Sequence, residues 1–329
     1  MLSFALWCQS NPIHRINIRY LSNPDQQIVK VFGPASLSNL GPGFDTLGLC
    51  LKGIGDVVEA SFSSKQGISI TSDAAIPLTA SKNTAGRAAH LVMTKAADKR
   101  GIHLHIKKGI PIGSGIGGSA ASASAGAWAV NLLLGAPFNK SELAYEVLEA
   151  ERLASGGVLH GDNALPSLLG GLILTSPVSP LDYRRVNLTR TMHLVVVLPK
   201  RSILTADART ILPSAVPRIE AIHNASDLVF MLHALMVGDW EVTAPYMMRD
   251  RIVEPARASL VPCYNAVREA ALDAGAYAVA LTGSGPAMFA IAKDEKSTSE
   301  ICAAMVEAAG EGANGIVTQA DMHGARLCT

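Results

Sequence analysis

The feature that most constrains this chain is a glycine-rich loop at residues 111–121, which reads PIGSGIGGSAA. The run has four glycines and two serines, and no charged residue occurs between Lys108 and Lys140. It follows the alternating stretch IHLHIKKG, typical of a strand, and precedes ASASAGAWAVNLLLG, typical of a helix of small residues. The first N–H groups of a helix lack internal partners and its dipole adds partial positive charge there, so this arrangement predicts an anion site.

Three kinds of nucleotide-binding loop can be compared with this run. Gly113, Gly115 and Gly118 satisfy G-x-G-x-x-G, but a dinucleotide fold also needs an acid at the end of the next strand, about 20 residues on. That distance falls in NKSELAYEVLEAE, whose pattern is helical. A Walker A loop is excluded because the run has no lysine. A third phosphate loop, P-x-G-S-G-[LI]-G-[GS]-S-A, fits best, and a plain turn is the simplest alternative.

Composition narrows the class of protein. The chain has 329 residues, 49% of them hydrophobic and 17% charged, which is enough to form a large core in one or two domains. A formal net charge of +1 gives no reason to expect nucleic acid or an anionic membrane as a partner. The five cysteines show no CxxC spacing, which indicates a reducing compartment, and we expect a cytoplasmic protein. The uncharged stretch 109–139 is read as a buried helix after a loop, and not as a membrane span.

Strand-like and helix-like stretches interleave along the whole chain, which predicts an α/β (α+β, two-layer) protein built from two units. We place the boundary near residue 190, giving domains at 28–190 and 191–329. Residues 1–27 differ from the rest, with no acid before Asp25, and we expect a disordered extension. An upstream start codon or a targeting peptide would also explain this stretch.

Two further glycine-rich segments resemble walls of a site. PASLSNLGPGFDTLGL, at residues 34–49, carries the polar residues Asn39 and Asp45, and LTGSGPAMFA, at 281–290, is a tight loop between two strand-like stretches. Each alone is typical of a turn. Three such loops near the start, middle and end of one chain indicate that they line a single site.

Together these segments resemble the GHMP kinase superfamily, which includes galactokinases, mevalonate kinases and homoserine kinases. The loop at 111–121 resembles its ATP motif, PASLSNLGPGFD its first motif and LTGSGPAMFA its third. Within the superfamily, HGDNALPSLLGG (160–171), LTADARTILP (204–213) and DRIVEPARASLVP (250–262) resemble segments of the homoserine kinase family. The resemblance covers about residues 28–329. It implies a ribosomal-protein-S5-like N-terminal domain with a left-handed βαβ crossover, a ferredoxin-like C-terminal domain, and a site between them.

The resemblance also implies roles for individual residues. Ser119 and Glu151 are expected to bind Mg²⁺, with Glu149 as the alternative carboxylate. The residues expected to bind ATP are Pro111, Ile112, Gly113, Ser114, Gly115, Ile116, Gly117, Gly118, Ser119, Ala120 and Ala121.

A homoserine acceptor has an ammonium, a carboxylate and a hydroxyl group, and each needs a partner. Asn39 and Asp45 suit the ammonium, whereas the guanidinium groups of Arg209 and Arg257 suit the carboxylate. The catalytic residues are expected to be Asp162, Thr205 and Arg209, with Asp162 acting as a base or only orienting the hydroxyl. His160 and Asn163 are expected to support the substrate beside Asp162.

The predicted activity is ATP- and Mg²⁺-dependent phosphorylation of L-homoserine to O-phospho-L-homoserine, a step of threonine biosynthesis. Other GHMP kinases, acting on mevalonate-type or sugar acceptors, are the alternative within the fold. A regulatory binding module without turnover and a dinucleotide oxidoreductase are alternatives from other classes. The resemblance leaves a homodimer open.

Overall fold

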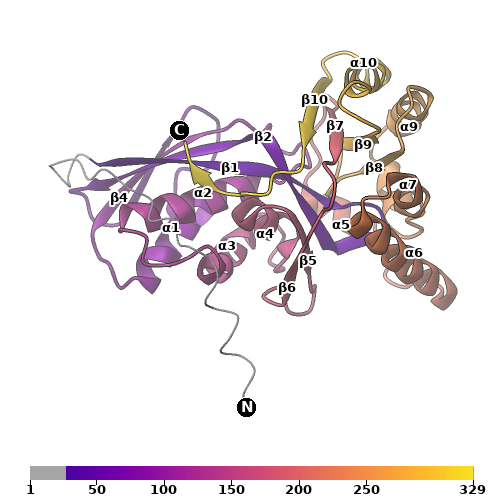
Figure 1. Ribbon diagram of the computed structural model, residues 1–329. Helices are drawn as coiled ribbons and strands as arrows, with labels where there is room; N and C mark the ends of the chain where they lie inside the picture. The colour runs from indigo at the N-terminus through magenta and orange to yellow at the C-terminus, as the bar shows by residue number, and fades with distance from the viewer. Residues whose placement is uncertain (1–26, 329) are drawn as a thin grey trace.

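The computed structural model describes residues 27–328, and the predicted extension therefore lies, except for residue 27, outside the described residues. Two sheets lie side by side, with helices against both (Figure 1). The α/β class predicted from the sequence is confirmed. The chain passes from the first sheet to the second between residues 186 and 193, and the proposed boundary at residue 190 lies in this link.

The first sheet has seven strands, ordered β11-β1-β2-β4-β3, with β5 paired to β2 and β6 paired to β5. These strands are β1 (Ile28–Asn39), β2 (Gly43–Ser63), β3 (Ile68–Ser72), β4 (Gly101–Lys107), β5 (Leu172–Thr175), β6 (Tyr183–Val186) and β11 (Arg326–Leu327). The 21-residue β2 pairs with β4 through its second half and with β5 through its first half. The sequence pattern predicted a loop over much of 34–49. In the structure, the extended backbones of β1 and β2 pair with each other on both sides of a short turn, and only residues 40–42 separate the two strands.

Three helices pack against one face of this sheet: α1 (Thr84–Lys95), α2 (Gly118–Leu133) and α4 (Gly161–Leu169). A fourth helix, α3 (Ala144–Glu151), packs on these three. Small residues let two of them approach the strands closely. A Cβ atom at Gly33 would lie 2.1 Å from the carbonyl oxygen of Ala121 on α2, and one at Gly48 would lie 1.7 Å from that of Asp162 on α4. The glycines of β1 and β2 therefore fix how deeply these helices sit.

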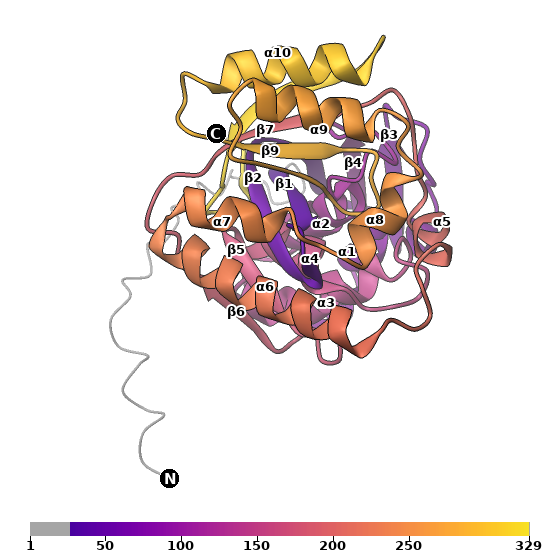
Figure 2. The same ribbon diagram turned by 90° about the vertical axis from the view of Figure 1, so that its right-hand side faces the viewer.

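The second sheet is antiparallel, with the order β10-β7-β9-β8 (Figure 1), and Figure 2 shows its strand β7 beside β9. Its strands are β7 (His193–Leu198), β8 (Ala278–Leu281), β9 (Met288–Ala292) and β10 (Asn314–Gln319). Its helices are α5 (Thr205–Thr210), α6 (Arg218–Val237), α7 (Trp240–Met247), α8 (Val253–Ala258), α9 (Tyr264–Asp273) and α10 (Thr298–Ala309). The strand order is that of a ferredoxin-like unit.

Alternate residues of β7 face two different cores. Leu194 and Val196 belong to the core shared with α6, α7 and the start of β2, whereas Val195 and Val197 pack toward α9 and α10. This alternation follows from the two-residue period of a strand, and it makes the second sheet a layer buried on both faces.

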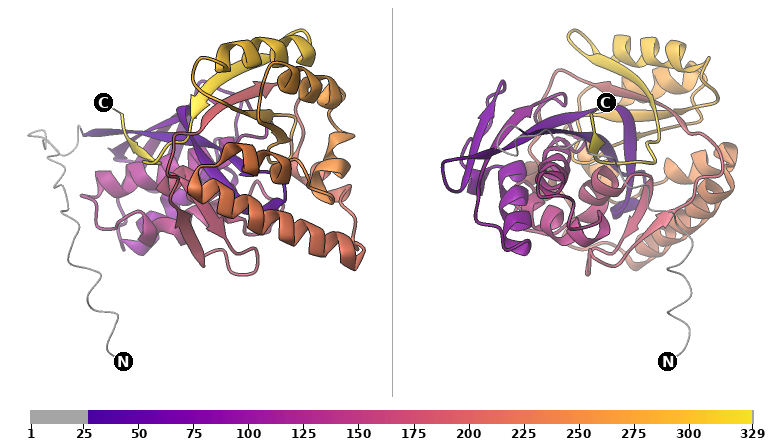
Figure 3. Two further views of the ribbon diagram at one scale, coloured as in Figure 1. Left: turned by 45° about the vertical axis from the view of Figure 1, so that its right-hand side comes forward. Right: turned by 60° about the vertical axis from the view of Figure 1, so that its left-hand side comes forward.

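After β10 the chain returns to the first sheet (Figure 3). Gly171 donates to the carbonyl oxygen of Asp321 and Ala325 donates to that of Ser167, so residues 321–325 run along the end of α4 before β11 pairs with β1. Among the described residues, no helix combines the length and the apolar character needed to cross a membrane.

Candidate active site

A cavity of about 590 Å³ lies where the three glycine-rich segments meet. Backbone hydrogen bonds join the segments at its floor. Ser36 of β1 donates to the carbonyl oxygen of Ile116 over 3.2 Å, and Ala287 donates to that of Ser114 over 3.2 Å. The loop at 111–118 is therefore fixed by β1 on one side and by the 282–287 turn on the other.

The glycine loop has a backbone that only glycine adopts easily. Gly113, Gly115 and Gly117 have φ values of 71°, 85° and 68°, in the left-handed region. Gly117 is the N-cap of α2 and supplies no side-chain hydrogen bond, so the first N–H groups of α2 open toward the cavity without a capping side chain. A Cβ atom at Gly117 would lie 2.2 Å from the hydroxyl oxygen of Ser36.

Not all residues of the predicted ATP motif line the cavity. Pro111, Ile112 and residues 113–115 and 117–119 do so. Ile116, Ala120 and Ala121 are fully buried in the cores below. Their side chains therefore support the loop and α2, because small apolar side chains gain more in the core, and only the backbone groups of these residues stay predicted contacts of the nucleotide.

A buried ion pair at the base of the loop was not predicted from the sequence. Lys108 contacts the carboxylate of Asp56, which is fully buried, and also donates to the carbonyl oxygen of Gly118 and the hydroxyl of Ser122. The other carboxylate oxygen of Asp56 accepts the backbone N–H of Gly109 over 3.0 Å. One carboxylate thus ties the entry of the loop to the first turn of α2. No local signal reveals this, since the partners are 52 residues apart.

A second carboxylate lies at the start of α2. The hydroxyl of Ser119 donates to Oε1 of Glu151 over 2.6 Å, and Oε2 of Glu151 is buried without a hydrogen-bond partner among the described residues. Burial raises the pKa of Glu151 to about 7, against the lowering effect of the Ser119 hydrogen bond. Glu149 instead contacts Arg152 over 3.1 Å and does not line the cavity.

The predicted acceptor residues meet at the other end of the cavity. Arg209 of α5 donates to Oδ1 of Asp45 over 2.8 Å, and the side-chain oxygen of Asn39 accepts the backbone N–H of Asp45 over 3.4 Å. Asn39 and Asp45 have φ values of 74° and 55°, a strained backbone that turns both polar side chains toward the site. In the structure, Asp45 and Arg209, which are expected to bind opposite ends of an amino acid, therefore neutralise one another.

Arg257 of α8 is buried and lies beside this pair. It donates to the carbonyl oxygens of Gly283 and Ala208 over 2.6 and 3.2 Å. Burial lowers its pKa to about 10, and the nearby charge of Arg209 acts in the same direction. The guanidinium carbons of Arg257 and Arg209 lie 5.0 and 5.5 Å from the ring centre of Phe44, close enough for cation–π attraction. Phe44 was not predicted as a site residue, although it directly precedes Asp45.

Asp162 lies at the first turn of α4 and lines the cavity. Burial raises its pKa to about 7, and the charge of Asp45 adds to this effect, whereas Arg209 and Arg257 act against it. The next residue, Asn163, holds α4 against β1 by accepting from Ser36 over 2.9 Å and donating to Ser38 over 3.0 Å.

His160 and Thr205 complete the predicted set. His160 lies 3.5 Å from Oδ2 of Asp45, and neither of its ring nitrogens has a hydrogen-bond partner among the described residues. Burial lowers the pKa of His160, and the charge of Asp45 acts against this effect. Thr205 begins α5 on the cavity wall, between the phosphate loop and Arg209. The cavity also has walls that the sequence did not indicate, formed by residues 75–77, 82–84 and 153–156.

Known proteins resemble this chain in sequence and in fold. The GHMP kinases N terminal domain matches residues 83–171, and the GHMP kinases C terminal domain matches residues 231–312. A homoserine kinase of Methanococcus maripaludis is 36% identical over 81% of this chain and 88% of its own length. One from Chlorobaculum tepidum is 34% identical over 84% of this chain and 89% of its own.

Solved structures extend the comparison to the fold. The crystal structure of homoserine kinase from Cytophaga hutchinsonii has a TM-score of 0.88 and 33% identity, covering 95% of this chain and 100% of the other. The L. major mevalonate kinase has a TM-score of 0.70 at 16% identity, over 88% of this chain and 95% of the other, and shares the fold alone. The chain belongs to the GHMP kinases, and within them to the homoserine kinase family.

Proposed function

We propose that this enzyme transfers the γ-phosphoryl group of ATP to the hydroxyl of L-homoserine, which gives O-phospho-L-homoserine for threonine biosynthesis. The observation that carries this proposal is the pairing of Asp45 with Arg209 next to the buried carboxylate of Asp162. These groups offer opposite charges for an α-amino acid and a carboxylate for its hydroxyl, at one end of a cavity whose other end is a phosphate loop.

ATP would lie along the glycine loop, with its phosphates facing the backbone N–H groups of residues 113–119. The partly apolar wall that includes Ile76 and Pro77 offers a surface for the base. The loop has no charged side chain of its own, so phosphate recognition rests on N–H groups and on the dipole of α2. Lys108 is held by Asp56 at the foot of the loop and adds positive charge there.

The residues at the start of α2 fit a magnesium ion. Described residues contain no group of three or more His, Cys, Asp or Glu side chains that could hold a metal, but Mg²⁺ on a nucleotide needs only one or two protein ligands besides phosphate and water. The unpartnered Oε2 of Glu151 and the hydroxyl of Ser119 are oxygen ligands of this kind. When bound there, the ion would neutralise charge on the phosphate oxygens.

Homoserine would replace the internal ion pair. Its ammonium would take the place of Arg209 beside Asp45, and its carboxylate would engage the guanidinium groups of Arg209 and Arg257. Each charged group then keeps a partner. An acceptor with only one of the two charges would leave Asp45 or the arginines unpaired in a poorly hydrated site, which disfavours its binding.

Phosphoryl transfer then needs the acceptor hydroxyl in line with the γ-phosphorus. The hydroxyl oxygen forms the new P–O bond, the bond to the β-phosphate oxygen breaks, and ADP leaves. Asp162 accepts a hydrogen bond from the hydroxyl, and its proton passes either to this carboxylate or to a γ-phosphate oxygen. Thr205 starts α5 and lines the cavity, and its hydroxyl would donate a hydrogen bond to the moving phosphoryl group.

An ADP-release assay with homoserine, mevalonate, galactose and shikimate as acceptors tests this proposal. Homoserine is expected to give the highest kcat/KM. N-acetyl-L-homoserine keeps the hydroxyl and the carboxylate but has no ammonium, so it separates the role of Asp45 from that of the arginines. Turnover of mevalonate or galactose equal to that of homoserine would refute the assignment.

We also propose that the enzyme works in the cytoplasm and forms a homodimer. The four cysteines among the described residues are free, in keeping with a reducing compartment. The exposed apolar side chains of Ile219, Ile222 and Val229 on α6 would favour self-association.

A further inference from the structure

Glu254 is a buried carboxylate that the proposed reaction does not use. It lies in the first turn of α8, is 8% exposed, and receives two hydrogen bonds on the same oxygen, Oε1. The backbone N–H of Leu281 donates to this oxygen over 3.1 Å, and the hydroxyl of Tyr264 on α9 donates to it over 2.8 Å. One side chain therefore joins α8, α9 and the end of β8.

The hydrogen bond from Leu281 lies at an edge of the second sheet. β8 is the outer strand of the order β10-β7-β9-β8, so the N–H groups on its outer side have no neighbouring strand to pair with. A buried N–H group without a partner is unfavourable, and Glu254 supplies the partner at the last residue of β8. The chain then enters the 282–287 turn, which contributes Gly283 and Ser284 to the wall of the active-site cavity.

The carbonyl group of Gly283 connects this turn to the acceptor end of the cavity. It accepts a hydrogen bond from Nδ2 of Asn39 over 3.2 Å and one from the guanidinium group of Arg257 over 2.6 Å. Asn39 ends β1 and Arg257 belongs to α8, so the relative position of these two side chains depends on the acceptor that they share. A shift of Gly283 would therefore move both.

Glu254 and Arg257 hold two successive outward groups of the same segment. The two residues are about 4.5 Å apart along the axis of α8. Their partners, the N–H of Leu281 and the carbonyl of Gly283, are at most about 6.6 Å apart along an extended chain. Between α8 and the end of β8 lies a cavity of about 10 Å³, the size of one water molecule. Hydrogen bonds, and not close packing, therefore fix the distance between them.

We propose that Glu254 is a positioning residue for the acceptor. It fixes the end of β8, which places the carbonyl of Gly283 and, through that carbonyl, the side chains of Asn39 and Arg257. The inference rests on the proposed function in one respect, namely that Asn39 and Arg257 bind the acceptor.

The nucleotide should be affected less than the acceptor. The 282–287 turn contacts the phosphate loop through Ala287, which donates to the carbonyl oxygen of Ser114. Ala287 directly precedes β9, and β9 is paired on both sides, with β7 and with β8. This contact with the phosphate loop is therefore held by the middle of the sheet and does not need Glu254.

The role requires an acceptor oxygen at residue 254 and not a negative charge. Burial raises the pKa of Glu254 to about 7, the hydrogen bonds from Tyr264 and Leu281 act against this effect, and the charges of Asp250 and Arg268 act for and against it. Both donors bind one oxygen, so the amide oxygen of a glutamine can replace it. Methionine has a similar length and offers no such oxygen.

Steady-state kinetics of three variants test this role. Glu254→Met should raise the KM for homoserine about tenfold and the KM for ATP by less than about twofold, because it leaves the N–H of Leu281 unpaired. Glu254→Gln should stay within about twofold of the wild type for both substrates. Tyr264→Phe removes one hydroxyl and keeps the bond to Leu281, so it should raise the KM for homoserine about threefold, and it keeps the test open if Glu254→Met does not fold.

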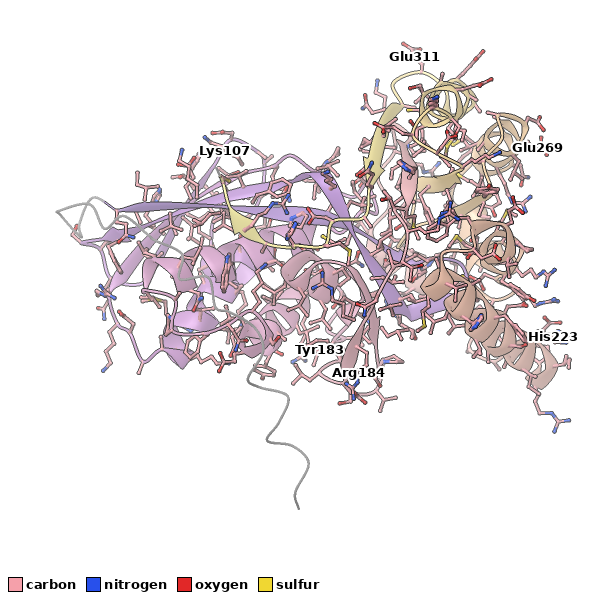
Figure 4. All side chains as sticks on the ribbon, in the orientation of Figure 1. Lys107, Tyr183, Arg184, His223, Glu269 and Glu311 are labelled. Carbon is pink, nitrogen blue, oxygen red and sulfur yellow. The ribbon has the colours of Figure 1, made fainter. Side chains whose placement is uncertain are left out.

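The matched control is Glu269→Met, at an exposed glutamate on the outer side of α9 (Figure 4), which should behave like the wild type. Three results would overturn the proposal. These are an unchanged KM for homoserine in Glu254→Met, an equal rise of both KM values in that variant, and equal effects of Glu254→Met and Glu254→Gln.

Hydrogen exchange measures the same link without an acceptor. In the protein without ligands, the amide of Leu281 should exchange at least about tenfold faster in Glu254→Met than in the wild type, Glu254→Gln or Glu269→Met. Faster exchange together with no turnover of homoserine by the wild type would refute the proposed function and leave the link between Glu254 and β8 intact. Normal turnover of homoserine with unchanged exchange at Leu281 would refute the positioning role alone.

Discussion

Replacement of Asp162 by asparagine should stabilise the protein while it removes most of the activity. Asp162 is 4% exposed, and burial raises its pKa from the ordinary 3.8 to about 7. At 1.36 kcal/mol per pH unit, ionising this carboxylate in the folded state costs about 4 kcal/mol. Asparagine has nearly the same shape and no charge. Because relaxation around the charge recovers part of this cost, we expect a gain of about 2–4 kcal/mol.

The stability difference between Asp162→Asn and the wild type depends on pH. The folded pKa lies above the unfolded one, so between pH 3.8 and about 7 the folded state binds more protons and wild-type stability falls as pH rises. Above pH 7 the ionised Asp162 lowers the free energy of unfolding by the full amount, and near pH 4 this loss of stability is absent. The advantage of Asp162→Asn should therefore be large at pH 8 and small near pH 4.5.

Urea unfolding of the two proteins without nucleotide, at both pH values, measures this difference. Asp273→Asn, at an exposed position near the end of α9, is the control and should show little difference at either pH. The kcat of Asp162→Asn with homoserine should fall by about 10²–10⁴ if the carboxylate takes the proton, and less if it only orients the hydroxyl. An equal stability gain at pH 4.5 and 8, or none at pH 8, would refute the argument from burial.

Four further substitutions test other parts of the site. Gly117→Val should abolish ATP binding in calorimetry while homoserine still binds, because the φ of Gly117 is +68° and a Cβ atom would meet the Ser36 hydroxyl at 2.2 Å. An unchanged affinity for ATP would place the nucleotide elsewhere. Arg209→Lys should lower kcat/KM for homoserine by about one to two decades, nearly as much as Arg209→Ala, since an ammonium group lacks the planar fork of a guanidinium group. Near-normal kinetics of the lysine variant would contradict this. Phe44→Leu should raise the KM for homoserine about tenfold and leave the KM for ATP unchanged, whereas Phe44→Tyr should behave like wild type. Equal effects of the two substitutions would show that only the packing of Phe44 matters. Asp56→Asn should instead raise the KM for ATP, and an effect confined to homoserine would exclude its role under the loop.

Local patterns in the sequence predicted the parts of the site that each lie within one short segment. The phosphate loop could be found because only glycine allows its backbone, and the glycines are close together in the chain. Asn39 and Asp45 came from a segment that resembles the first motif of the GHMP kinases, and Asp162, Arg209 and Arg257 from segments that resemble homoserine kinases. The structure brings all five to one cavity.

Contacts between distant segments could not be predicted. Asp56 lies in β2 and Lys108 directly follows β4, and neither position carries a pattern that points to the other. Phe44 carries no local signal of a site, because an aromatic residue beside a turn is usually part of a core. A choice between Glu149 and Glu151 as the predicted metal ligand requires knowing which side of α3 faces the cavity, and a count of residues along the chain does not show this.

The return of the chain to the first sheet has a consequence for the order in which the enzyme is completed during synthesis. The edge strand β11 and the segment against α4 are translated after every strand of the second sheet. Until then, β1 has an unpaired edge, and the helix that carries Asp162 and Asn163 lacks the contacts of Asp321 and Ala325. A nascent chain that has only the phosphate loop and the first sheet is therefore an incomplete unit, and its open edge is a place where two such chains can pair wrongly. Because the last strand completes the first sheet, formation of the active site depends on the synthesis of both halves of the chain.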